Sequence, residues 1–216
     1  MPADLQQAES ASAVARHIAS VAARLFAERG FDATSVRDIV EASSVTKPTL
    51  YYHFNSKQGL AEALLSRPLA ALVEEMQRIV DTTSEPAARL GALLDAQFAF
   101  CRDDPDRARF AYAVFFGPNS SARWTELNEY GRALANFISS AVDALVQSGQ
   151  VPADRAARCT TAARGMVTVY TLDLLYREGE LPGDLGRTLV DDLLKGFAAS
   201  EAPDVAPAQR RGELPR

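Results

Sequence analysis

The chain has 216 residues, a net charge of −5 at neutral pH, 47% hydrophobic residues and 24% charged residues. This is the composition of an ordinary folded protein, so it excludes disorder along the whole chain. Two cysteines, Cys101 and Cys159, are too few for a disulfide scaffold, and no run of about 18 apolar residues is present to span a membrane. The polar start of the chain carries no secretion signal, which predicts a cytoplasmic protein without a membrane partner.

The charge is unevenly distributed. Residues 13–60 carry six Lys and Arg against four Asp and Glu, whereas residues 1–12 and the remainder are acidic. A mildly basic segment on an acidic body is a local electrostatic footprint. A split of this size also occurs by chance, so it indicates a nucleic-acid partner only together with a matching motif.

The N-terminal third is predicted to contain one long and two short helices. Ser12 is a suitable N-cap for the first helix, and Gly30 can adopt the left-handed conformation that ends it. Residues 1–12 are then expected to be a disordered arm. The short helices are predicted over 35–42, where Ser35 and Asp38 form a capping box, and over 46–53, where Thr46 is the cap.

The rest of the chain is predicted to form longer helices, so the fold class is all-α with about nine helices. Proline and glycine mark each boundary, and no alternating strand pattern competes. We expect two domains, over 13–60 and 61–200, followed by a disordered tail over 201–216. The longer helices are predicted over 56–80, with Ser56 as the cap, and over 86–102, 105–116, 121–148, 153–178 and 185–199.

The two short helices and the turn between them are typical of a helix-turn-helix. Val36, Ile39 and Leu50 are expected to face inward, because so short a pair needs the first helix for stability. The outward face then presents hydroxyl groups, an ammonium group and a phenol, which suit base edges and phosphates. The predicted DNA contacts are Thr46, Lys47, Thr49, Tyr52 and His53 on the second short helix, with Thr34, Ser35, Arg37 and Lys57 at helix starts.

The stretches LFAERGFDATSVRDI (25–39) and VTKPTLYYHF (45–54) resemble the N-terminal domain of TetR-type (TetR/AcrR-like) transcriptional regulators. The resemblance covers about residues 13–60. It implies a homodimer that binds a near-palindromic operator in double-stranded DNA. It also implies that a small ligand usually releases the protein from this DNA. By this resemblance Thr46, Lys47, Pro48 and Thr49 match the start of the recognition helix, Tyr52, His53 and Lys57 match DNA-backbone contacts, and Tyr51 matches a position of contact or packing.

Two departures from the family pattern concern the DNA-binding region. Ser44 occupies a turn position where the family usually has glycine, and a positive φ there costs a serine some energy. His17 stands where the family often has arginine, which weakens one phosphate contact.

By the same resemblance, a ligand pocket is expected between the helices at 86–102, 105–116, 121–148 and 153–178. Such a pocket is mostly apolar with a few polar anchors. Gln97, Asp95 and Asp173 are the candidates for these anchors, which favours a hydrophobic and cationic ligand. The predicted lining residues are Leu94, Gln97, Phe98, Phe110, Trp124, Leu127, Met166 and Tyr170.

Small residues along 153–178 let helices approach closely, and 185–199 offers a wide apolar surface. Two copies of this pair are predicted to form a four-helix interface with two-fold symmetry. Packing within one chain is the alternative.

Two other classes of function are less well supported. An all-helical enzyme lacks its usual signals, since the only histidines are His17 and His53 and no zinc-protease, nucleophile-elbow or phosphate-loop motif is present. We therefore expect no catalytic residue, metal or cofactor, and inert buried thiols. A helical adaptor without DNA binding is argued against by the intact stretch 46–53. Ligand identity, operator sequence and repression or activation stay open.

Overall fold

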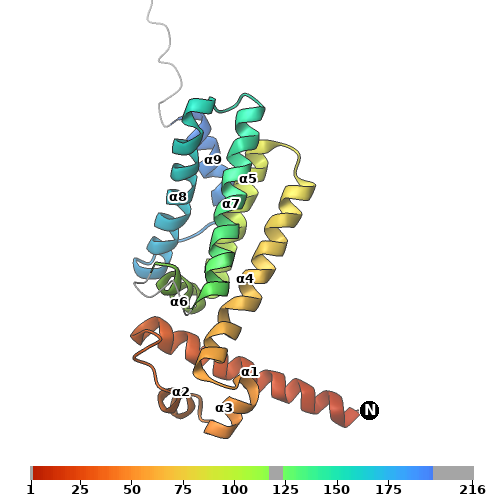
Figure 1. Ribbon diagram of the computed structural model, residues 1–216, viewed down its shortest axis with the longest axis vertical. Coiled ribbons are helices and arrows are strands. Elements are labelled where there is room, and N and C mark those ends of the chain that lie inside the picture. The colour runs from red at the N-terminus through yellow and green to blue at the C-terminus, as the bar shows by residue number, and fades with distance from the viewer. Residues whose placement is uncertain (1, 117–123, 197–216) are drawn as a thin grey trace, which may run out of the picture.

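The computed structural model describes residues 2–116 and 124–196. Within these ranges the chain forms nine α-helices and no strand, so the all-α prediction is confirmed (Figure 1). The first three helices form one end of the molecule, and the longer helices stand together at the other (Figure 1). The helices are α1 (Pro2–Arg29), α2 (Val36–Ser43), α3 (Lys47–Phe54), α4 (Lys57–Thr82), α5 (Pro86–Asp103), α6 (Pro105–Phe116), α7 (Thr125–Gln147), α8 (Ala156–Tyr176) and α9 (Leu185–Lys195).

The start of α1 differs from the prediction. The helix begins at Pro2, so Ser12 lies inside it and residues 2–12 are helical rather than an arm. Leu, Gln, Ala and Glu dominate this stretch and favour a helix, and its one proline stands at the first position, where a helix tolerates it. The predicted end is confirmed, because Gly30 has a φ of 84° and donates its N–H to the carbonyl of Phe26 at 3.0 Å.

The predicted caps of the two short helices are confirmed. At α2 the Ser35 hydroxyl accepts the N–H of Asp38 at 3.1 Å, and the Asp38 carboxylate accepts the Ser35 N–H at 2.7 Å. The hydrogen bonds from Ser35 hold the pKa of Asp38 below its usual value. At α3 the Thr46 hydroxyl accepts the N–H of Thr49 at 3.3 Å. These side chains satisfy N–H groups that a helix start leaves without partners.

Helix α4 joins the two halves of the molecule. Its first half, including Leu60 and Leu65, is buried against α1 and α3, and its second half, including Met76, is buried against α5 and α7. Pro68 lies between these halves. Because proline has no N–H, α4 lacks one internal hydrogen bond where it passes from one core to the other.

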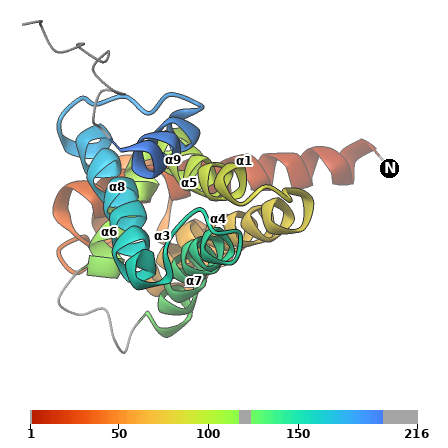
Figure 2. The ribbon, with the colours of Figure 1, turned by 90° about the horizontal axis from the view of Figure 1, so that it is seen from above.

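Helices α4, α5, α7, α8 and α9 stand side by side when the molecule is seen from above (Figure 2). Helix α5 contacts each of the other four. The predicted segment 153–178 begins with a 3-10 turn, and α9 ends at Lys195, followed by Gly196 with a φ of 79°. The predicted helix start at 121 and the predicted tail over 201–216 lie outside the described residues.

Helix α9 packs closely on α5 at two glycines. A Cβ atom added to Gly186 would lie 2.4 Å from the carbonyl oxygen of Gly91 and 2.7 Å from the backbone nitrogen of Asp95. The Gly186 N–H donates to the Asp95 carboxylate at 2.6 Å. Burial nevertheless raises the pKa of Asp95. The two backbones therefore leave no room for a side chain at this crossing.

We predict that Gly186→Ala lowers the free energy of unfolding by about 2 kcal/mol, because the added methyl group overlaps backbone atoms that cannot move aside. Gly183→Ala is the control, since no atom lies within 4 Å of a Cβ added there. Urea denaturation of the two variants measures the difference. Equal stability of both variants would contradict the close packing of α9 on α5.

Candidate nucleic-acid interface and ligand cavity

Helix α3 exposes one face and anchors the other. Leu50 is fully buried, whereas Tyr51 is 43% exposed and Tyr52 is 80% exposed. Lys47 and Pro48 are also exposed and lie one turn earlier on the same face as the two tyrosines. An ammonium group and two phenols on a fixed helix are able to reach phosphates and base edges in a groove of DNA.

Two of the predicted DNA contacts at the start of α2 serve the fold instead. Thr34 is fully buried, and its hydroxyl donates to the carbonyl of Gly30 at 2.8 Å, so this side chain is not available to DNA. The Ser35 hydroxyl is bonded to the Asp38 carboxylate at 2.6 Å. A carboxylate at this helix start repels a phosphate, so the start of α2 is a poorer anion site than its sequence predicts.

Arg37 and His53 keep partial access to solvent. The Arg37 guanidinium donates to Glu41 at 2.6 Å, and both side chains are largely exposed. Such exposed pairs contribute little to stability, so Arg37 can leave Glu41 for a phosphate. His53 is half-buried, with its ring centroid 5.0 Å from that of Tyr52.

Lys57 has a structural role that the sequence did not indicate. Its Nζ donates to the carbonyl of Phe31 at 2.9 Å and to that of Thr34 at 2.8 Å. The same nitrogen lies 4.2 Å from the centroid of the Phe31 ring. Two of its three N–H donors therefore hold the loop between α1 and α2, and a phosphate contact by Lys57 stays a prediction.

The turn between α2 and α3 has the positive φ at Ser44 that is expected to cost a serine some energy. Ser44 has a φ of 54°, and its N–H donates to the carbonyl of Glu41 at 3.3 Å. The ring nitrogen Nε2 of His17 lies 3.2 Å from the carbonyl oxygen of Ser43. His17 therefore links α1 to the end of α2 rather than serving only as a weakened phosphate contact.

A cavity of about 520 Å³ lies between α5, α6, α7 and α8. Its volume is in the range of small-molecule sites. Aromatic and aliphatic side chains form much of its wall, and two arginines and several uncharged polar groups complete it. The lining residues are Gln97, Tyr112, Phe115, Phe116, Asn128, Gly131, Arg132, Leu134, Ala135, Ile138, Arg164, Val167 and Thr168.

Of the eight residues predicted to line a pocket, Gln97 lines this cavity. Phe110, Trp124 and Leu127 instead form part of the core between the bundle and the helix-turn-helix. The centroid of Phe110 lies 4.9 Å from that of Phe26, a residue of α1. The other predicted residues also do not line the cavity, since Leu94 and Phe98 are in the bundle core, Met166 packs against that core, and Tyr170 is 37% exposed beside Phe98.

The charged groups of the cavity are basic rather than acidic. Asp95 is bonded to the start of α9, and Asp173 pairs with Arg177 at 3.3 Å, so neither anchors a ligand there. Arg132 and Arg164 are exposed and line the cavity. The sequence signal for them was weak, because arginines on long helices are usually solvated.

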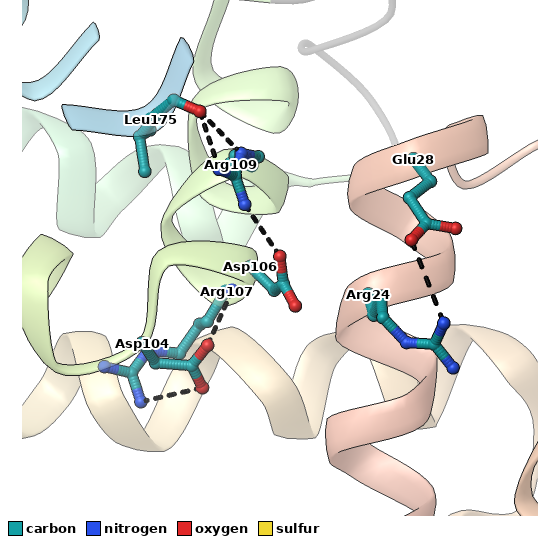
Figure 3. A network of polar contacts seen from close by, with 7 residues as sticks. All are labelled: Arg24, Glu28, Asp104, Asp106, Arg107, Arg109 and Leu175. Atoms are coloured by element: carbon teal, nitrogen blue, oxygen red, sulfur yellow. Dashed lines mark hydrogen bonds and ion pairs between the residues drawn. The ribbon is translucent and has the colours of Figure 1, made fainter. Parts of the chain in front are cut away.

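Helix α6 separates the cavity from the helix-turn-helix. Tyr112 and Phe115 line the cavity, whereas Phe110 and Val114 are buried with the residues of α1. Figure 3 shows how α6 is also tied to the end of α8, where the Arg109 guanidinium donates to the carbonyl of Leu175 at 2.9 Å. One helix therefore contacts the cavity, α1 and α8.

The outer face of α8 carries a row of exposed residues three or four positions apart, which we name the α8 stripe. Val169 is 56% exposed and Tyr176 is 62% exposed. On α9, Leu189 and Val190 are buried in the bundle core, so this part of the apolar surface predicted over 185–199 is not available to a second copy. The α8 stripe consists of Ala157, Thr161, Gly165, Val169, Leu172 and Tyr176.

The cysteines have the properties of structural residues. Burial raises the pKa of Cys101 to about 11, and burial also raises the pKa of Cys159. A thiol that stays protonated is a poor nucleophile. Across the described ranges no three His, Cys, Asp or Glu side chains gather as a metal site, and no helix there is long and apolar enough to cross a membrane.

A helix-turn-helix with an exposed second helix, joined to a helical bundle with a ligand-sized cavity, is the architecture of a transcriptional regulator. Residues 18–64 match the profile of bacterial regulatory proteins of the tetR family. The HTH-type transcriptional repressor KstR2 of Mycobacterium tuberculosis is 42% identical over 78 residues, which are 36% of this chain and 39% of that protein. KstR2 of Rhodococcus jostii is 30% identical over 138 residues, which are 62% of this chain and 66% of that protein.

The chain belongs to the TetR family, a family of transcriptional regulators rather than enzymes. The match to the Mycobacterium tuberculosis relative spans well under half of that protein's length.

Solved structures share the fold over most of the chain. The structure of KstR2 of Mycobacterium tuberculosis has a TM-score of 0.73 and 24% identity, and the match covers 84% of this chain and 93% of that chain. FadR of Bacillus subtilis, solved in complex with stearoyl-CoA, has a TM-score of 0.64 and 16% identity, and the match covers 85% of this chain and 99% of that chain. At these identities the likeness establishes the fold alone.

We predict that Lys57→Met lowers the free energy of unfolding by about 2 kcal/mol, because it leaves two carbonyl groups without their charged donor. Lys47→Met is the matched control, since Lys47 is exposed on α3 and has no such role in the fold. Urea denaturation followed by circular dichroism measures both variants. Equal losses of stability in both variants would contradict the conclusion that the hydrogen bonds of Lys57 stabilise the loop between α1 and α2.

Proposed function

We propose that this protein is a ligand-responsive transcriptional regulator. It binds a near-palindromic operator as a homodimer, and an amphipathic anion that occupies the cavity releases it from the DNA. The observation that carries the proposal is the exposed face of α3, where Lys47, Tyr51 and Tyr52 project while Leu50 anchors the helix. Family membership supports DNA as the partner. Several relatives are named repressors, which supports repression as the outcome.

The geometry of the operator follows from two-fold symmetry. A dimer presents two α3 helices, and these fit successive major grooves with half-site centres about 34–36 Å apart. Lys47 and Arg37 suit phosphates, whereas Thr46, Thr49 and the two tyrosines suit base edges and sugar-phosphate oxygens.

The proposed effector has an apolar part and an anionic part. Tyr112, Phe115 and Ile138 offer an apolar wall, and Arg132 and Arg164 offer positive charge on the exposed side of the same cavity. This chemistry suits an acyl thioester of coenzyme A, which joins a hydrocarbon chain to phosphate groups. FadR of Bacillus subtilis was solved with such a ligand, stearoyl-CoA.

The proposed route from effector to DNA runs through α6. A ligand that fills the cavity presses on Tyr112 and Phe115, and the opposite face of α6 is packed against α1 through Phe110. A small movement of α6 therefore changes the orientation of the helix-turn-helix. The effector acts only to the extent that it binds the two orientations with different affinity.

The α8 stripe is the proposed centre of the dimer interface. Its small residues, such as Gly165, let two helices approach closely, and Val169, Leu172 and Tyr176 supply apolar area. A Cβ atom at Gly165 would have no neighbour within 4 Å in one copy of the chain. Leu193 of α9, which is half-buried against the bundle core, is proposed to extend this surface.

We expect selection from random duplex DNA to enrich a near-palindrome, and Lys47→Ala and Tyr52→Ala each to weaken binding to it by about tenfold. Lys47→Ala is also expected to reduce the slope of log K against log salt by about 2, because a dimer loses two phosphate contacts. Fluorescence anisotropy at several salt concentrations measures both effects. Lys195→Ala, an exposed lysine of α9, is the control. Unchanged affinity in both α3 variants would refute the proposed contact face.

Val169→Glu is expected to convert the dimer to a monomer, because it places two carboxylates in the centre of an apolar interface. Light scattering at micromolar protein concentration gives the mass. Ser140→Glu, at an exposed position on α7, is the control and should leave the dimer intact. A wild-type chain of monomeric mass would overturn the proposal of a homodimer.

A further inference from the structure

Gln97 interrupts an otherwise apolar row on α5. Leu90, Leu94 and Cys101 precede and follow it at helical spacing, and all three are buried in the bundle core. Gln97 turns from this core to the cavity that it lines. An amide in such a row is out of pattern for a residue whose only task is packing.

The Nε2 atom of Gln97 is buried and has no hydrogen-bond partner among the residues that the structure describes. A buried N–H group without a partner destabilises a protein, so native structures rarely keep one without a reason. The buried hydroxyl group of Thr171 on α8 differs in this respect, because it donates to Cys101 Sγ at 3.8 Å.

We propose that Gln97 is a specificity-determining residue that donates a hydrogen bond to an uncharged acceptor oxygen, such as a ketone or ester carbonyl, on the apolar part of the effector. The inference rests on the proposed effector cavity and adds a second recognition point to it. Arg132 and Arg164 bind the anionic part on the exposed side, and Gln97 selects among hydrocarbon chains on the buried side.

An uncharged oxygen fits this place better than a carboxylate. Burial raises the pKa of Tyr112, which shows that its surroundings disfavour negative charge. The arginines of the cavity are exposed, so they neutralise an anion on the solvent side rather than beside Gln97. A neutral carbonyl accepts the Gln97 N–H without bringing a charge out of water.

The test compares octanoyl-CoA with two octanoyl-CoA derivatives that carry one ketone at different places along the chain. Dissociation constants are measured by calorimetry for the wild-type protein, for Gln97→Met and for Gln147→Met. Methionine has the length and flexibility of glutamine without its hydrogen bonds, and Gln147 is an exposed glutamine at the end of α7, which makes it the control.

We expect the wild type and Gln147→Met to bind one ketone derivative about tenfold more tightly than octanoyl-CoA, and Gln97→Met to bind the three thioesters equally. Gln97→Met should melt at the same temperature as the ligand-free wild type or higher, because it removes the buried unpaired N–H group. A lower melting temperature would assign Gln97 to the fold and overturn the inference.

The other outcomes are also decisive. If the wild type binds all three thioesters equally, the inference is overturned while the proposed effector class stands. The inference fails in the same way if Gln97→Met keeps the preference for the ketone. If a hydroxyl group in place of the ketone binds the wild type about tenfold more tightly still, Gln97 accepts rather than donates, which overturns the proposal as stated. If no thioester binds the wild type, the proposed effector class and this inference fall together.

Discussion

The packing of Phe31 in the loop between α1 and α2 fixes how the two halves of the protein meet. Its carbonyl accepts a hydrogen bond from Lys57 at the start of α4, and the same ammonium group lies over its ring. The ring is 5.2 Å from that of Trp124 and 6.5 Å from that of Phe110, measured between centroids. One residue therefore connects α4, α6 and the start of α7. Helices α2 and α3 have eight residues each and are too short to be stable alone, so their orientation depends on this cluster.

Through the same cluster, the cavity and the helix-turn-helix share α6 as a common wall. Helix α6 contributes Phe110 to the cluster and Tyr112 to the cavity wall, two positions apart on one rigid element. A protein core is close-packed and transmits displacement rather than absorbing it. Arg109, bonded to the carbonyl of Leu175, restrains α6 at the end of α8, so a movement of α6 must be a tilt or a shift that this bond permits. The exposed α8 stripe lies on that neighbouring helix, which places the proposed dimer interface within reach of the same movement.

Features that depend on a single turn of chain could be predicted from the sequence. The caps at Ser35 and Thr46 and the stop at Gly30 need only residues three or four positions away, and all three are confirmed. Features that depend on distant partners could not. Lys57 meets carbonyl groups 23 and 26 residues away, and nothing in the residues around it signals that contact. The cavity is the clearest case, because aromatic residues on α6 alternate between two buried environments. Hydrophobicity alone does not tell Phe110, which faces α1, from Tyr112, which faces the cavity.

The use of positive charge within the helix-turn-helix constrains how DNA can be bound. The whole chain carries a charge of −5, and Lys57, one of the few cations of the N-terminal segment, is largely engaged in holding a loop. Arg37 is paired with Glu41, and the proposed contact with a phosphate would require Arg37 to leave that ion pair. Counterion release from one copy of the chain is therefore limited, since it scales with the number of phosphates neutralised. In the proposed complex, uncharged groups on α3, above all the exposed phenol of Tyr52, would carry much of the interaction, and such groups act only at close range in a fitted groove. A regulator with so little long-range attraction gains most from engaging two half-sites at once, which the proposed dimer would provide and a change in the spacing of its two α3 helices would remove.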